Sequence, residues 1–176
     1  NDDRITYANT GLTAQTTVPW VKYPGAGATK EASLEGIRTG GLYRYCPDVK
    51  MYKCPTGIRT EFVTYAIVDA MNGHPDIPGT SKLMVYRRAQ ITRADQRIVF
   101  LDEGRLSPNS WTLWYDQERW WDQITARHGD GTNFGFADGH SEYWKWKDPR
   151  TLEVAKTDYD MWQNSTRNTA EATQPG

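Results

Sequence analysis

The most informative part of the chain is RHGDGTNFGFADGHSEYWKW, residues 127–146. Asp138-Gly139 separates two runs rich in aromatic residues, NFGFA and HSEYWKW, and a two-residue Asp-Gly loop is the favoured type I′ connection of a β-hairpin. This loop predicts four facing pairs, which are Ala137 with His140, Phe136 with Ser141, Gly135 with Glu142 and Phe134 with Tyr143. Both hairpin faces would then carry aromatic side chains, and we expect other parts of the protein to cover each face.

Two further segments predict strands that join this hairpin. EFVTYAIVDAM, residues 61–71, is β-branched and aromatic and ends at Asn72-Gly73, which indicates a strand followed by a loop. RIVFLDEG, residues 97–104, is a compact apolar run that ends in acids, as a buried strand of about six residues would. We therefore expect a central antiparallel sheet.

Helices are expected to be short. A helix is predicted over residues 30–38, because Leu34 and Ile37 are three residues apart and two glycines follow. A second short helix is predicted over residues 42–45. Residues 1–29 are rich in Thr, Gly and Pro and predict surface loops, and the polar tail of residues 164–176 predicts disorder. The fold class expected is α+β.

The length and charge of the chain indicate how many domains it has and which classes of partner are disfavoured. The length of 176 residues predicts a single domain over residues 1–176. With 21 Lys and Arg against 22 Asp and Glu, the net charge is -1, so the chain lacks the positive field that favours nucleic acid or anionic lipid. No apolar stretch reaches the roughly 20 residues that span a bilayer, and the start, NDDRITYANT, shows no targeting signal.

Cys46 and Cys54 are close in sequence, and each is followed by Pro. A disulfide between them would stabilise the fold by roughly 2–3 kcal/mol and would imply an oxidising compartment. The alternative is two buried thiols in a reduced protein. Their spacing is not that of a CxxC metal or redox motif.

A mononuclear metal-dependent hydrolase would use as ligands either the three histidines, His74, His128 and His140, or two of them with Asp102 or Glu103. If residues 132–137 form a strand, His128 and His140 lie roughly 20 Å apart, at opposite ends of the hairpin. One zinc ion with bonds of about 2 Å cannot join them. No HExxH pair is present, so we expect neither a metal nor another cofactor.

Other catalytic patterns are also missing from the sequence. There is no GxSxG, GxxxxGK[ST] or GxGxxG motif. Asp122 and Asp130 are conceivable as paired carboxylates for glycoside cleavage, but solvated surface acids are the simpler interpretation. Asp130 or Asp2 and Asp3 are conceivable calcium ligands, but no DxDxDG loop is present. We therefore expect the protein not to be an enzyme.

One segment contributes four tryptophans, Trp111, Trp114, Trp120 and Trp121. Flat indole rings can stack on the apolar faces of sugars, so the segment is a candidate carbohydrate-binding surface. The alternative is that these rings cover the sheet, which we favour because Trp is highly buried on average.

The spacing of His128, nine residues and Asp138-Gly139 near the carboxyl end resembles the H-X9-DG processing-associated motif of prepilin-like proteins of planctomycetes and verrucomicrobia. Three other segments resemble the same family in the same order, namely MYKCPTG, TYAIVDAMNG and RADQRIVFLDEG. Together they cover residues 42–148. Cys46 and the Trp-rich insert of residues 111–121 depart from the family pattern.

The resemblance implies a pilin-like head that belongs to a type II secretion pseudopilin or a type IV pilin-like protein. Such a protein is exported, periplasmic or at the cell surface, and is anchored in the inner membrane before assembly by an apolar N-terminal helix, which would lie upstream of residue 1. Its partners would be other pseudopilin or pilin subunits. His128 would hold the loop that enters the hairpin by hydrogen bonding, Gly129 and Gly131 would allow unusual backbone angles, and Asp138-Gly139 would form the turn.

Overall fold

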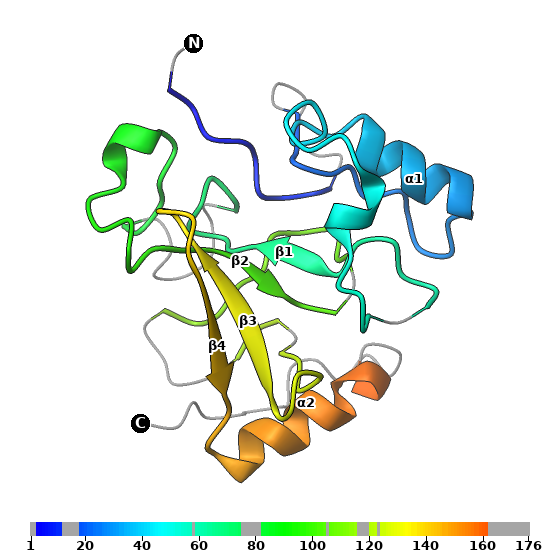
Figure 1. Ribbon diagram of the computed structural model, residues 1–176, viewed down its shortest axis with the longest axis vertical. Helices are drawn as coiled ribbons and strands as arrows, with labels where there is room; N and C mark the ends of the chain where they lie inside the picture. Colours follow the sequence, from blue (N-terminus) through cyan, green and yellow to red (C-terminus); the bar gives the residue numbers. More distant parts are fainter. Residues whose placement is uncertain are drawn as a thin grey trace.

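A computed structural model describes residues 3–11, 18–57, 59–74, 82–104, 106–115, 120–122 and 124–161, so the tail predicted at residues 164–176 lies outside it. The protein belongs to the α+β class (Figure 1). In chain order its elements are α1 (Lys30–Arg38), the 3-10 helix η1 (Val49–Tyr52), β1 (Tyr65–Ile67), the 3-10 helix η2 (Arg88–Gln90), β2 (Ile98–Asp102), β3 (Gly131–Phe136), β4 (Ser141–Lys145) and α2 (Pro149–Met161).

The four strands form one antiparallel sheet in the order β1-β2-β3-β4. The prediction of a strand over residues 97–104 is confirmed by β2. The strand predicted over residues 61–71 is shorter, because the chain turns at Asp69 after Val68 has formed a single parallel bridge with Trp111. The sheet is thus a meander whose last two strands form the predicted hairpin.

The predicted hairpin register was wrong by one residue. Gly135 pairs with Ser141, and the backbone N–H of Phe136 donates to the carbonyl of His140 at 2.9 Å. The loop therefore has three residues, closed by a bond of 3.0 Å from the Gly139 N–H to the Phe136 carbonyl. Within it Gly139 has a positive φ, of 97°, and Asp138 does not, whereas a type I′ turn needs two such residues.

This shift gives the hairpin one apolar face instead of two. A slip of one residue moves every side chain of a strand to the opposite face relative to its partner strand. Phe134 therefore lies with Trp144, their ring centroids 4.6 Å apart, and not with Tyr143. Tyr143 shares the other face with Asn133 and Gly135. Tyr143 still gives this other face an aromatic ring, but the expectation that both hairpin faces are apolar is wrong.

The protein core lies against the face that carries Phe134, which we call the core face. Phe134 and Leu101 are almost completely buried there. Trp111, Trp120 and Trp146 continue this core through successive ring contacts, with centroids 6.1 Å and then 5.6 Å apart. The opposite face, which carries Phe100, Asp102 and Gly135 by strand alternation, we call the open face.

Two helices were predicted before the sheet, and one of them is present. The prediction of a helix at residues 30–38 is confirmed by α1, whose N-cap Thr29 accepts a bond of 3.2 Å from Ala32 and whose Ile37 is buried. Residues 42–45 form a hydrogen-bonded turn and not the predicted second helix.

The sequence analysis missed α2, although the sequence carries a signal for it. Asp148 accepts a bond of 2.8 Å from the Arg150 N–H, and Pro149 occupies the first helical position. An Asp cap followed by Pro is typical of a helix start. Val154 and Ala155 of α2 pack against the core.

Candidate functional site

His128 lies at the base of the hairpin, in the turn that leads into β3. The turn has positive φ angles at Gly129 (73°) and Asp130 (66°), so the prediction for Gly129 is confirmed. Gly131 is required for a different reason, because a methyl group there would collide with the carbonyl oxygen of Trp144. This backbone directs the His128 ring toward the end of β2.

Three side chains meet at that point, and we call Cys54, Asp102 and His128 the His128 cluster. Nε2 of His128 lies 2.8 Å from Oδ2 of Asp102 and 3.5 Å from Sγ of Cys54. The other Asp102 oxygen, Oδ1, accepts a hydrogen bond from Arg127. The Asp102 side chain is 1% exposed and that of His128 21%, so the cluster is buried except at the imidazole.

Hydrogen bonds from separate parts of the chain hold the cluster in place. The Asp102 carbonyl accepts bonds from the hydroxyls of Thr125 at 2.8 Å and Thr132 at 3.0 Å. The backbone N–H of Cys54 donates to the hydroxyl of Thr64 at 2.7 Å. The Cys-Pro segment, the end of β2 and the start of β3 therefore fix these side chains relative to one another.

The predicted disulfide is not formed, because Cys46 and Cys54 are both free. Cys54 is buried, and its sulfur contacts His128 and the hydroxyl of Thr56 at 3.1 Å. Cys46 instead lines a pocket on the open face of the sheet. The two thiols therefore lie in different environments, although they are close in sequence.

The His128 cluster does not have the geometry of a Cys-His-Asp catalytic triad. In a triad the nucleophile and the acid bind opposite nitrogens of the imidazole. Here the sulfur of Cys54 and the carboxylate of Asp102 both approach Nε2 of His128. The arrangement instead fits a structural hydrogen-bond network, or three side chains that direct their ligand atoms toward one shared metal ion.

His140 lies at the opposite end of the hairpin from His128, as the distance argument predicts, and His74 is not part of the cluster either. His140 is at the tip of the hairpin, where Nδ1 lies 2.6 Å from Asp138 and Nε2 lies 3.5 Å from Glu142. The backbone N–H of His74 donates to buried Asp69. Among the described residues, the group of metal-ligating side chains within reach of one ion consists of Cys54, Asp102 and His128, so a site built on two histidines is not assembled there.

Asp138 and His140 alter each other's ionisation. Hydrogen bonds to Asp138, the largest from the backbone N–H of His140, lower the pKa of this carboxyl. The hydrogen bond that the His140 imidazole donates to Asp138 raises the pKa of this imidazole, and Glu142 adds to the effect. Both side chains are more than one third exposed, so the pair belongs to the surface of the turn.

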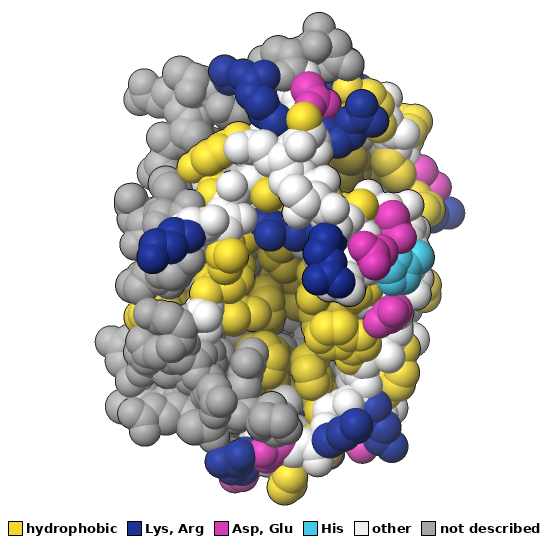
Figure 2. All heavy atoms as spheres, turned by 90° about the vertical axis from the view of Figure 1, so that its left-hand side faces the viewer, with side chains coloured by type: hydrophobic (Ala, Val, Ile, Leu, Met, Phe, Trp, Pro, Cys, Tyr) yellow, Lys and Arg dark blue, Asp and Glu magenta, His cyan; other side chains and the backbone are white. Residues whose placement is uncertain are grey.

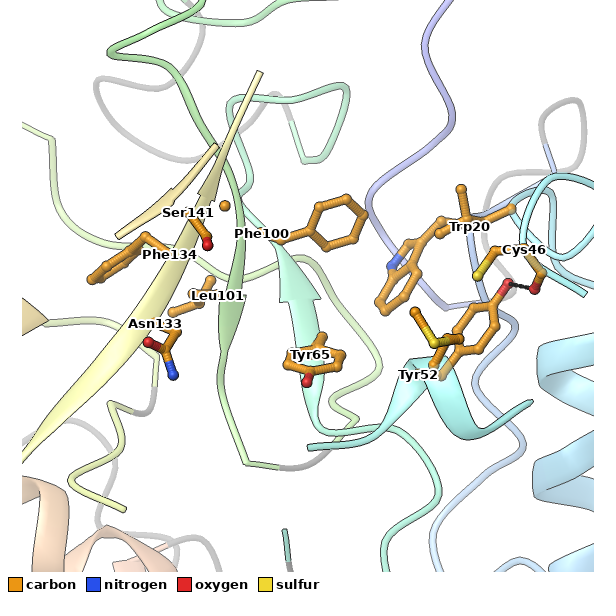
Figure 3. A pocket seen from close by; sticks show the side chains of 12 residues that line it. Trp20, Cys46, Tyr52, Tyr65, Phe100, Leu101, Asn133, Phe134 and Ser141 are labelled. Carbon is orange, nitrogen blue, oxygen red and sulfur yellow. Dashed lines mark hydrogen bonds between the residues drawn. The ribbon is translucent and has the colours of Figure 1, made fainter. Parts of the chain in front are cut away.

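An apolar pocket of about 370 Å³ opens on the open face of the sheet (Figure 3). Trp20 and Tyr52 approach from the segments before the sheet, and the Trp20 ring meets Phe100 edge-on at 5.7 Å. Tyr65 of β1 also lines the pocket. Burial raises the pKa of Tyr52 to about 12 and raises that of Tyr65, to which nearby Cys54 and Asp102 contribute. These phenols therefore stay neutral at physiological pH.

The four tryptophans do not form one platform. Trp111 is buried and contacts Trp120, whose indole nitrogen is also buried. Trp121 is 45% exposed and contacts Trp114 at 4.7 Å, with their planes tilted by 50°. Two of the four rings thus serve the core, as the favoured interpretation expected.

The remaining acidic candidates have structural partners. Asp122 accepts a bond of 2.8 Å from the Thr112 N–H, and Asp130 is 3.3 Å from Nζ of Lys156. Asp3 accepts a bond of 2.9 Å from the Ala89 N–H, while Asp2 lies outside the described residues. Glu103 is buried next to Asp102.

The fold and the site define an α+β protein with a buried Cys-Asp-His cluster at one end of its sheet. Comparisons with protein-family models, with curated proteins and with solved structures found no match to the chain. In the described part of the chain, no helix has the length and apolar character needed to cross a bilayer. Figure 2 shows the side of the molecule that is on the left in Figure 1. Apolar side chains gather at the centre of this side, and Lys and Arg side chains surround them.

Proposed function

We propose that this chain is the head of a pilin-like subunit, a non-enzymatic structural or assembly component of a type II secretion or type IV pilus-like system. The observation that carries the proposal is that the H-X9-DG residues hold the hairpin at both ends. His128 binds Asp102 at the base, and Asp138 and Gly139 form the turn at the tip. These roles are structural, which suits an assembly subunit better than an enzyme.

The pocket on the open face gives this proposal a specific arrangement. In the family that the sequence resembles, the head packs on the carboxyl half of a long N-terminal helix. We propose that this helix lies along the open face, with its apolar side chains next to Met51, Tyr65 and Phe100, which line the pocket and keep part of their surface exposed. Removing this apolar surface from water would stabilise the contact. The same helix would anchor the subunit in the inner membrane before assembly with other pseudopilin subunits.

The precursor of the protein tests this proposal. We expect an upstream leader that ends in Gly, followed by Phe-Thr-Leu-Ile-Glu and an apolar run. Expressed with a prepilin peptidase, the precursor should lose the leader, which N-terminal sequencing detects. A precursor with no such leader, or one that the peptidase leaves intact, would contradict the proposal.

The docked helix is tested by Met51→Asp in the processed protein. Met51 lines the pocket and is 63% exposed, so the substitution leaves the core in place and puts a charge where the helix should lie. We expect reduced cross-linking into oligomers. Tyr45→Asp is the matched control, because Tyr45 is 73% exposed and does not line this pocket. Equal cross-linking of both variants would contradict helix packing at this site.

The alternative function, a secreted carbohydrate-binding module, rests on the exposed ring of Trp121 beside Trp114. A glycan array discriminates the two functions. Binding that disappears in Trp121→Ala would favour the module, and absence of binding leaves the pilin-like proposal in place.

A further inference from the structure

We propose that the His128 cluster is a binding site for a divalent cation of the zinc type. Sγ of Cys54, a carboxylate oxygen of Asp102 and a ring nitrogen of His128 all lie within 4.8 Å of one another. They come from three segments that are far apart in the sequence. This inference goes beyond the proposed function, and either one can hold without the other.

The separations are close to those of a tetrahedral site. With a Zn–S bond of about 2.3 Å and a Zn–N bond of about 2.0 Å, a tetrahedral angle places sulfur and nitrogen about 3.5 Å apart. The distance between Sγ of Cys54 and Nε2 of His128 is 3.5 Å. Nε2 and Oδ2 of Asp102 are 2.8 Å apart and would need to separate by about 0.5 Å around an ion, since tetrahedral Zn–N and Zn–O bonds place these atoms about 3.3 Å apart.

The donor set selects the kind of cation. A thiolate is a soft ligand that favours zinc over calcium or magnesium, which take oxygen ligands. Binding releases the thiol proton of Cys54 to solvent, and it uses the neutral His128 ring with its proton on Nδ1, so that the Nε2 lone pair faces the ion. The thiolate and the carboxylate then bring two negative charges to the ion, and Arg127 beside Asp102 offsets one of them.

The groups around the cluster fit the outer shell of a metal site. Arg127 binds Oδ1 of Asp102 and leaves Oδ2 directed at the cluster, and the Thr56 hydroxyl lies 3.1 Å from Sγ of Cys54. Outer partners of this kind orient the ligands and tune the affinity. The partly exposed ring of His128 gives the ion a route from solvent, and with three protein ligands a tetrahedral ion would take water as its fourth ligand.

The test uses Co²⁺ as a spectroscopic probe and Zn²⁺ as the competing ion. The wild-type protein should bind one Co²⁺ with a thiolate-to-metal charge-transfer band, and Zn²⁺ should abolish the band. Cys54→Ser should remove the band and weaken Zn²⁺ binding by about 100-fold or more, because it removes a direct ligand. Cys46→Ser is the matched control and should bind like the wild type, since Cys46 lies outside the cluster.

A measurement on the wild-type protein covers the case in which Cys54→Ser does not fold. Zn²⁺ should slow the alkylation of Cys54 by iodoacetamide and leave that of Cys46 unchanged, which mass spectrometry of the two peptides resolves. The proposal is overturned if the wild-type protein binds neither ion at micromolar concentration, if folded Cys54→Ser keeps the band, or if Cys46 is the thiol that Zn²⁺ protects.

Discussion

The hairpin has a His–Asp pair at each end, and the two pairs have similar N–O distances but differ in burial and in sequence separation. At the base His128 and Asp102 are 2.8 Å apart, and at the tip His140 and Asp138 are 2.6 Å apart. The base partners are 26 residues apart in sequence and the tip partners two. The Asp102 side chain is 1% exposed and that of Asp138 is 38% exposed.

A short contact between two charged groups therefore has no fixed energetic value. Water and salt screen an exposed pair, and such pairs contribute little to stability. A buried carboxylate depends on its partners, and its loss leaves them without compensation. We therefore expect the base pair to organise the tertiary structure and the tip pair to affect mainly the ionisation of the turn.

The largest effect is expected for Asp102→Ala at the base. It leaves Arg127 and His128 without their carboxylate, and we expect the free energy of unfolding to fall by about 3 kcal/mol, as measured by urea denaturation. Asp138→Ala is the matched change at the tip and should lower stability much less. If the two variants lose the same stability, burial does not separate the two pairs.

The next largest effect is expected for Gly139→Val at the tip. Its φ of 97° is strained for a β-branched residue, so thermal denaturation should show a loss of about 1–3 kcal/mol. Gly139→Asn is the control and should retain most of the stability, because Asn tolerates this region better. An unchanged melting temperature in Gly139→Val would contradict the three-residue loop.

A smaller effect is expected for Thr132→Val at the base. The substitution keeps the shape of the side chain and removes the hydroxyl bonds to the Asp102 carbonyl and to Thr125. Because a typical buried hydrogen bond contributes about 1 kcal/mol, urea denaturation should show a loss of this order. Stability equal to that of the wild type would argue that the Thr125 hydroxyl alone satisfies this carbonyl.

The smallest effect is expected for Asp138→Asn, read from the pKa of His140 by NMR. The pKa of His140 is raised above 6.5, so its contribution to stability is complete below this value and is lost as pH rises through the folded pKa. The pKa of Asp138 is lowered below 3.8, so its contribution is complete above this value and is lost as pH falls through the folded pKa. The Asp138–His140 pair thus stabilises the folded protein most between pH 3.8 and pH 6.5.

In Asp138→Asn the pKa of His140 should fall toward its ordinary value. The corresponding titration of His140 in Asp102→Asn should not change, because Asp102 lies at the other end of the hairpin. A His140 pKa that is the same in Asp138→Asn and in the wild type would show that Glu142, and not Asp138, sets it.

The sequence predicted several helices and strands well, and it predicted less well how they pair and pack. It located α1, β2 and the hairpin because capping, apolar runs and Asp-Gly turns act over a few residues. It missed α2, although Asp148-Pro149 signals its start. The hairpin register was wrong because two-residue and three-residue loops both accept Asp-Gly. The backbone N–H groups of Ala137 and Asp138 hold the three-residue loop by donating to the carbonyls of Arg97 and Ala94, which no local pattern predicts.

For the candidate site, the spacing argument separated His128 from His140, and the structure has them at opposite ends of the hairpin. The place of Cys54 beside His128 was not predicted. These residues are 74 positions apart, and nothing local in the sequence links them. The sequence pointed instead to Cys46, the nearest other thiol along the chain.

The sequence alone therefore determined the positions of α1, β2 and the Asp-Gly turn, and that His128 and His140 cannot share an ion. These properties depend on short-range sterics and on the rise of a strand. Only the tertiary structure decided which hairpin face is apolar, which cysteine meets His128 and which His–Asp pair is buried. Packing of distant segments controls these outcomes, because a shift of one residue or the choice of a neighbour changes the burial of a side chain without changing its local sequence.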